Sequence, residues 1–167
     1  MAIHFNHTIL LARDSKASAD FLADMLGLPA PRRWGPFYMV TTDNDANLDY
    51  MDTEGEIVRQ HYAFLVGDGE FEAIFNRIRE RDLRYWADPG QRKPSETNDH
   101  DSGRGVYFED PNGHLVEIIT RPYGSAAGIR ELGAKGGEPG ADYGQPGGNI
   151  PERRGAAAPL ISVGAAA

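Results

Sequence analysis

Apolar residues follow two spacings along the first 122 residues of the chain. Short apolar runs at residues 3–12 and 61–66 predict strands. Each run is followed by a segment in which apolar residues recur three or four positions apart, as on one face of an amphipathic helix. These residues are Phe21, Leu22, Met25 and Leu26 in the first segment and Phe71, Ile74, Phe75 and Ile78 in the second. The pattern therefore predicts a strand followed by a helix, twice.

Residue types found at helix ends bound both predicted helices. Asp14 or Ser15 is expected to cap the first helix, Gly27 to end it, and Asp68 to cap the second. Further strand-like runs occupy residues 37–42 and 47–51 after the first helix and residues 84–88, 105–110 and 114–120 after the second. Both halves thus contain a strand, a helix and several strands, which indicates an internal duplication of a unit of about sixty residues.

Composition divides the chain into one domain and a tail. The chain has 167 residues, of which 40% are hydrophobic, and this suits one compact domain with a core. We expect that domain at residues 1–122, with module one at 1–53 and module two at 57–121. Residues 123–167 are rich in Gly, Ala and Pro and have few residues able to build a core, which predicts an extended arm or a disordered tail.

Charge and cysteine content exclude several classes of function. The net charge of −8 argues against nucleic acid and anionic membranes as partners. The sequence has no apolar run of membrane-spanning length and no signal peptide, so a soluble cytoplasmic protein is expected. Because there is no cysteine, a metal could be held only by histidine, carboxylate or water.

Carboxylates recur at matching places in the two halves. Asp49 lies eleven residues after Tyr38 and Glu117 lies ten after Tyr107, so we expect the two carboxylates to be equivalent. Glu117 has apolar neighbours along its strand, and a buried carboxylate without a partner is costly. The position of Glu117 therefore calls for a cation or a hydrogen-bond donor beside it.

A histidine also stands at the same place in each half. His7 and His61 each lie seven residues before the aspartate that follows their strand. Strand alternation places each of them on one face of its sheet. Two imidazoles and one carboxylate around an open cavity form the facial triad that binds divalent iron and similar metals. We predict that His7, His61 and Glu117 bind a divalent metal, with Fe2+ or Mn2+ favoured and Ni2+ or Zn2+ as alternatives.

The sequence also resembles a known family. The segments "NHT", "QHYAF" and "GVYFEDPNGHLVEII" and the duplicated pattern are similar to the vicinal oxygen chelate superfamily, which includes glyoxalase I, fosfomycin-resistance transferases, extradiol dioxygenases and bleomycin-binding proteins. The resemblance covers residues 3–121. It implies an α+β fold in which two βαβββ modules form cupped mixed sheets around a metal, and the family's ligands fall on His7, His61 and Glu117. Substrates of this family chelate the metal through neighbouring oxygens.

Residues 98–117 resemble the signature of extradiol ring-cleaving dioxygenases. This resemblance implies that His100 and Tyr107 lie near a bound catechol, where they would transfer protons or hold an oxyanion. An extradiol-type dioxygenase is therefore the first expectation. The general-base histidine of these dioxygenases has no counterpart in this chain, and Asp49 could stand in for it.

Three alternatives to the dioxygenase remain. In a glyoxalase I-like lyase, Asp49 would be a fourth metal ligand. A fosfomycin transferase ranks below both, because the family's threonine is replaced by Ile9. A protein that sequesters an antibiotic or metabolite without turnover would not need a full set of metal ligands, so the retained ligands favour an enzyme.

Each candidate residue also has a purely structural explanation. Glu117 could pair with Arg121, and Asp49 could be a hydrogen-bonding residue of the cavity wall. His100 could be an exposed loop residue and Tyr107 a core aromatic. The histidines expected to take no part are His4 and His114.

A small-molecule substrate and a second copy of the chain are the expected partners. The sheet of one module forms half a cavity, so two modules must face each other to bring His7 beside His61 and Glu117. If the two modules of one chain lie side by side, each site takes His7 from one chain and the other two ligands from its partner in a homodimer. Pairing of the modules within one chain is the alternative.

Overall fold

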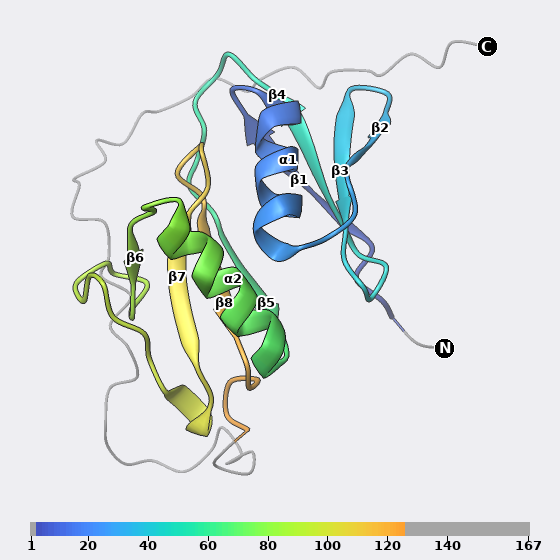
Figure 1. The fold of residues 1–167 in the computed structure, drawn as a ribbon. Helices are drawn as coiled ribbons and strands as arrows, with labels where there is room; N and C mark the ends of the chain where they lie inside the picture. Colours follow the sequence, from blue (N-terminus) through green and yellow to red (C-terminus); the bar gives the residue numbers. More distant parts are fainter. Residues whose placement is uncertain (1–2, 126–167) are drawn as a thin grey trace, which may run out of the picture.

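Two modules of the same topology follow one another in the computed structural model, which describes residues 3–125 (Figure 1). The first contains β1 (His7–Ala12), α1 (Ser15–Leu26), β2 (Arg32–Trp34), β3 (Phe37–Thr41) and β4 (Asn47–Asp52). The second contains β5 (His61–Leu65), α2 (Asp68–Glu80), β6 (Tyr85–Trp86), the 3-10 turn η1 (His100–Ser102), β7 (Gly105–Glu109) and β8 (Leu115–Ile119). The strand orders are β1-β4-β3-β2 and β5-β8-β7-β6, with the first and last strands of each module parallel. The predicted α+β fold of two βαβββ modules is confirmed.

The strand register makes the histidines and the carboxylates equivalent in the two modules. His7 and His61 are the first residues of β1 and β5. Two positions further on, Ile9 pairs with Asp49 and Ala63 pairs with Glu117. Each module therefore has a histidine and a carboxylate on adjacent parallel strands and on the same face of its sheet.

The expected equivalence of Tyr38 and Tyr107 is wrong by one position. Asp49 pairs with Met39, whereas Glu117 pairs with Tyr107, so Met39 is the counterpart of Tyr107. Tyr38 pairs with Tyr50 on the opposite face and packs against the core. A shift of one residue in a strand moves a side chain to the other face of the sheet, and only the pairing fixes that register.

The helix ends follow local rules, with one correction. The carboxylate of Asp14 caps α1 by accepting a hydrogen bond from the Ala17 N–H at 2.8 Å, and Gly27 ends α1 in the left-handed conformation with φ 73°. The cap of α2 is Gly67, not Asp68 as predicted. Asp68 is instead the first helical residue, where its negative charge is favourable near the helix N-terminus. No helix within residues 3–125 is long and apolar enough to cross a membrane.

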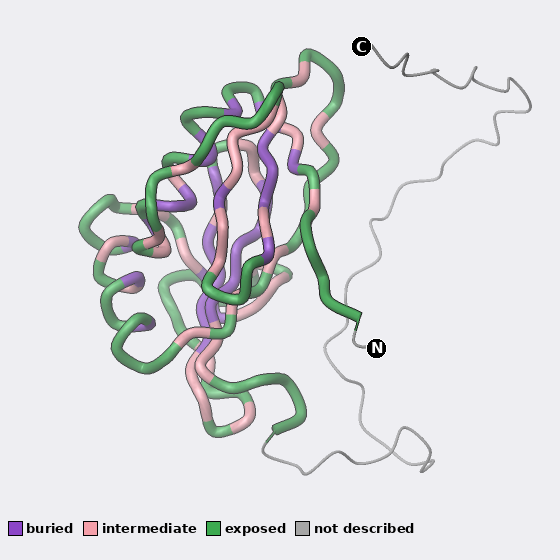
Figure 2. Tube along the Cα trace, turned by 90° about the vertical axis from the view of Figure 1, so that its right-hand side faces the viewer, coloured by how far each residue is buried: buried purple, intermediate pink, exposed green. Residues whose placement is uncertain are grey.

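Each sheet has one covered face and one open face. In Figure 1, α1 covers the first sheet and α2 the second, and α1 also contacts α2. Figure 2 shows that buried positions follow the strands, whereas the connecting loops and residues 3–6 are exposed. The open faces carry apolar side chains, among them Ile9 (44% exposed), Trp34 (69%) and Leu65 (62%). His7, His61 and their carboxylates belong to these open faces.

The turn between β7 and β8 joins the two modules. Asn112 donates a hydrogen bond from Nδ2 to Ser18 Oγ at 2.9 Å and accepts one from the Arg13 N–H at 3.0 Å, and both partners belong to module one. His114, the residue before β8, is buried and also bonds to module one. The DPNGH segment of the sequence therefore fixes how the modules pack within one chain.

Candidate metal centre

The clearest pair of potential metal ligands lies on the open face of module two. Glu117 is fully buried, and its Oε2 lies 3.1 Å from Nε2 of the half-exposed His61. The carboxylate accepts, so the imidazole carries its proton on Nε2. β5 and β8 hold the two side chains together because they pair in parallel at this position.

The spacing of this pair fits a divalent ion. Two ligand atoms bound at about 2.1 Å in neighbouring positions of an octahedral ion lie about 3.0 Å apart. The observed separation of 3.1 Å between His61 Nε2 and Glu117 Oε2 matches this value. The separation is therefore compatible with both atoms binding one ion, once Nε2 has lost its proton and the imidazole has turned toward the ion.

Two tyrosines complete the surroundings of Glu117. The Tyr123 hydroxyl donates a hydrogen bond to Glu117 Oε1 and lies 2.9 Å from the Tyr107 hydroxyl. The Tyr107 ring also lies beside the His61 ring, with 5.7 Å between their centroids. Arg121, the partner that the sequence offered for Glu117, takes no part in this network.

The surroundings keep the Glu117 carboxylate ionised. Burial acts to raise the pKa of Glu117, but hydrogen bonds from His61, Tyr107 and Tyr123 together lower it. Burial and the neighbouring carboxylate raise the pKa of Tyr107 far above its ordinary value, so its hydroxyl stays protonated as a donor. An ionised carboxylate beside an imidazole is a suitable donor set for Fe2+ or Mn2+.

Module one holds the corresponding half-site. Burial raises the pKa of Asp49 above its ordinary value, and the electrostatic influence of His7 opposes this rise only in part. Asp49 is 7% exposed, and within residues 3–125 its Oδ1 is buried without a hydrogen-bond partner. His7 Nδ1 lies 2.8 Å from Asn6 Oδ1. Module one thus offers an exposed imidazole beside a carboxylate oxygen that lacks a partner.

One chain does not assemble the predicted triad. No group of three histidine or carboxylate side chains within residues 3–125 is placed to hold a metal. His61, Glu117 and Tyr107 are brought together, whereas His7 lies with Asp49 in the other module. Of the two arrangements that the sequence left open, pairing within one chain is therefore not the one found.

The structure places His100 apart from this network. It lies in the exposed turn η1, where its backbone N–H is 3.4 Å from Asn98 Oδ1. Within the described range, its ring makes no hydrogen bond. The next residue, Asp101, accepts a hydrogen bond from the Gly124 N–H at 2.9 Å. The loop of His100 therefore contacts the segment that carries Tyr123.

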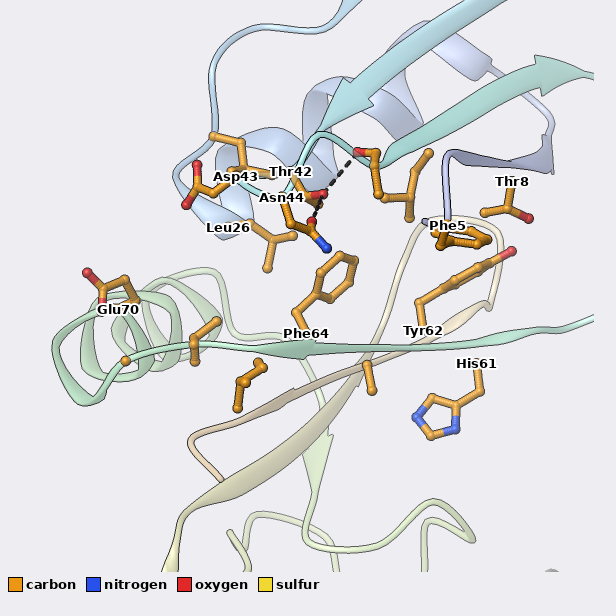
Figure 3. A pocket seen from close by; sticks show the side chains of 17 residues that line it. Phe5, Thr8, Leu26, Thr42, Asp43, Asn44, His61, Tyr62, Phe64 and Glu70 are labelled. Carbon is orange, nitrogen blue, oxygen red and sulfur yellow. Dashed lines mark hydrogen bonds between the residues drawn. The ribbon is translucent and has the colours of Figure 1, made fainter. Parts of the chain in front are cut away.

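A cavity of about 720 Å3 lies between the edge of β5 and module one (Figure 3). Its walls are largely apolar and include Phe5 and Phe64. His61 lines it too, although Figure 3 shows the His61 ring on the opposite side of β5 from Tyr62 and Phe64. The cavity therefore borders the site but does not include Glu117.

Comparison with known proteins identifies the family. The profile of the Glyoxalase/Bleomycin resistance protein/Dioxygenase superfamily matches residues 4–118. The chain belongs to this superfamily. The predicted family resemblance is thus confirmed over nearly the whole range of residues that the sequence indicated.

Several members of the superfamily are similar to this chain. Oxidase ChaP-H1 is 61% identical, and the match covers 74% of this chain and 99% of that one with a TM-score of 0.73. Glutathione transferase FosA of Serratia marcescens is 29% identical over 119 residues, 68% of this chain and 77% of FosA. The fosfomycin resistance protein FosX of Listeria monocytogenes, solved with Mn(II) and a sulfate ion, is 19% identical. The match covers 75% of this chain and 96% of that one, and the two share the fold with a TM-score of 0.57.

Sequence reasoning within the superfamily pattern missed Tyr123. The composition change placed this residue at the start of the C-terminal arm, yet its hydroxyl contacts Glu117. The remainder of the predicted arm, residues 126–167, lies outside the described residues. In the sequence, Tyr123 stands out only as an aromatic residue in a segment rich in Gly and Pro, and this feature does not predict a contact with Glu117.

Proposed function

We propose that this protein is a metal-dependent oxidase whose small substrate chelates the metal through two adjacent oxygens. The observation that carries the proposal is the 61% identity to Oxidase ChaP-H1 across almost all of that protein. The His61–Glu117 pair supports it, because an imidazole and an ionised carboxylate at 3.1 Å suit a metal that reacts with oxygen. Extradiol cleavage of a catechol-like ring is the specific oxidation that the sequence signature at residues 98–117 favours.

The proposed centre uses His61 and Glu117 from one chain and His7 from a second copy. When bound there, Fe2+ or Mn2+ would supply Lewis acidity toward the two oxygens of the substrate. Tyr107 would direct its protonated hydroxyl toward charge that develops on the substrate. His100 would exchange protons with the substrate only if its exposed loop approached the bound substrate, and this role is the one that the family resemblance implies.

The open faces of the two sheets support the shared arrangement. Each face carries apolar side chains without cover and half of a ligand set. A two-fold pair that joins module one of one copy to module two of the other would bury both faces and form two equivalent sites. The unpartnered Asp49 Oδ1 would then face the same centre, and it favours a four-ligand, glyoxalase-like site as the second candidate.

A mixing experiment tests the shared centre. His7→Ala and Glu117→Ala chains should each bind no Fe2+ or Mn2+ tightly when alone, because each lacks one ligand at every site. After subunit exchange, a mixed dimer should bind one ion, since one of its two sites contains all three wild-type ligands. Strictly monomeric wild-type protein, or no gain of bound metal despite proven exchange, would contradict the proposal. Oxygen uptake with catechol, compared with isomerisation of a hemithioacetal, separates the oxidase from the lyase.

A further inference from the structure

The Tyr123 hydroxyl reaches into the site from a segment that is otherwise exposed. Tyr123 is 55% exposed, yet its hydroxyl bonds to the fully buried carboxylate of Glu117. An exposed tyrosine has many rotamers available, so this inward position depends on the hydrogen bonds that hold it. The Tyr107 hydroxyl, 2.9 Å away, provides a second partner.

The backbone around Tyr123 is tied to the loop of His100. The Gly124 N–H donates to Asp101 Oδ2 at 2.9 Å, and the Ser125 N–H donates to the Pro122 carbonyl at 3.2 Å. Gly124 has φ +77°, a left-handed conformation that favours glycine at this turn. These contacts hold the backbone of this segment where the Tyr123 hydroxyl reaches Glu117 Oε1.

The two oxygens of Glu117 therefore have different surroundings. Oε1 accepts a hydrogen bond from Tyr123, whereas Oε2 faces His61 Nε2 at 3.1 Å. A carboxylate held by one oxygen cannot rotate freely, so its second oxygen keeps its direction. Hydrogen bonds of this kind to a ligating carboxylate orient it and affect how strongly it binds a metal.

We infer that Tyr123 is a positioning residue, which holds Oε1 of Glu117 so that Oε2 alone, beside His61 Nε2, is presented to the metal. The inference rests on one part of the proposed function, namely that a metal binds at His61 and Glu117. Binding through one oxygen leaves coordination positions for the two oxygens of a chelating substrate. Loss of the hydroxyl removes one of the three side-chain hydrogen bonds to Glu117, which lets the carboxylate turn or bind through both oxygens.

The test is the affinity of the full-length protein for Mn2+, measured by competition with a chelating dye. Tyr123→Phe removes the hydroxyl and keeps the ring, and we expect it to weaken Mn2+ binding by about tenfold or more. Asp101→Ala, which removes the bond to Gly124, should weaken binding in the same direction and by less. Tyr85→Phe is the matched control, because Tyr85 packs edge-on against Phe75 away from Glu117 and should bind as the wild type does.

A second readout separates positioning from folding. The thermal midpoint of the metal-free Tyr123→Phe protein should stay near that of the wild type, while the visible absorption of its Co2+ form changes because Glu117 coordinates differently. Affinity within twofold of the wild type together with an unchanged Co2+ spectrum would overturn the role of Tyr123. A wild-type protein that binds neither Mn2+ nor Co2+ would overturn the metal centre itself, which is a distinct failure.

Discussion

Replacement of His114 should test how strongly the two modules are joined within one chain. The His114 ring is buried, and its Nδ1 accepts a hydrogen bond from the Gln60 N–H at 3.2 Å. Its Nε2 lies 3.0 Å from the Leu11 carbonyl, so the ring is neutral and donates from Nε2. Leu11 belongs to β1 of module one, whereas Gln60 precedes β5 of module two. One imidazole therefore bridges both modules.

His114→Ala removes both hydrogen bonds and leaves a space beside Tyr62, whose ring packs edge-on against the imidazole at 6.0 Å. Each lost bond costs about 0.5–1.5 kcal/mol, and more where the remaining partner is left unpaired. Loss of a buried side chain adds a cavity term. We expect the free energy of unfolding to fall by about 2–4 kcal/mol, a large part of the about 5–15 kcal/mol of an ordinary domain.

Urea unfolding of metal-free protein, followed by circular dichroism, measures this loss. His114→Gln should lose less than His114→Ala, because the glutamine amide can still donate to the Leu11 carbonyl. His4→Ala is the control, since His4 is exposed, and its effect should stay within about 0.5 kcal/mol. A loss below about 1 kcal/mol for His114→Ala would refute the bridging role, because two hydrogen bonds to a buried ring should contribute more.

Three further variants test the burial of Asp49 and the close contact at Gly105. Asp49→Asn should be more stable than the wild type at pH 7 in the presence of a chelator. Burial raises the pKa of Asp49, so the wild type loses stability as the pH rises from the unfolded pKa of about 3.9 through the folded pKa. In urea melts at a series of pH values, the stability difference between the two proteins should vanish near pH 3. Gly105→Ala should lower the thermal midpoint of unfolding, because the new Cβ would lie 2.5 Å from Asn98 Oδ1 and Asn98 is held by a 2.9 Å hydrogen bond to the Ala87 carbonyl. Gly69→Ala on α2 should raise the midpoint, because a Cβ there meets open space. Equal effects of the two substitutions would contradict this account.

The sequence alone determined the features that depend on neighbouring residues. The spacing of apolar residues predicted both helices and most strands, and Asp14 and Gly27 marked the ends of α1. The repeated offset of His7 and His61 predicted their equivalence, which the register of the sheets bears out. These features could be predicted because helix periodicity, strand alternation and capping act over a few residues.

Other parts of the fold lacked a local signal. β2 was not predicted, because all three of its residues are exposed and a short edge strand has no apolar pattern. The strand expected at 84–88 is reduced to Tyr85–Trp86. The alignment of Tyr38 with Tyr107 was wrong because no local signal gives the register of a strand. The register of Tyr38 depends on its pairing with β4, a separate segment of the chain.

Only the tertiary structure decided which candidate residues meet. It joined Glu117 to His61 and Tyr123, and within residues 3–125 it did not bring His7 to that pair. It also gave His114, which the sequence set aside, a buried place between the modules. Strand alternation in the sequence predicts which side chains share a face. The residues that this face contacts depend on how distant segments of the chain pack. That packing is a sum of many weak contacts, which no short stretch of sequence contains.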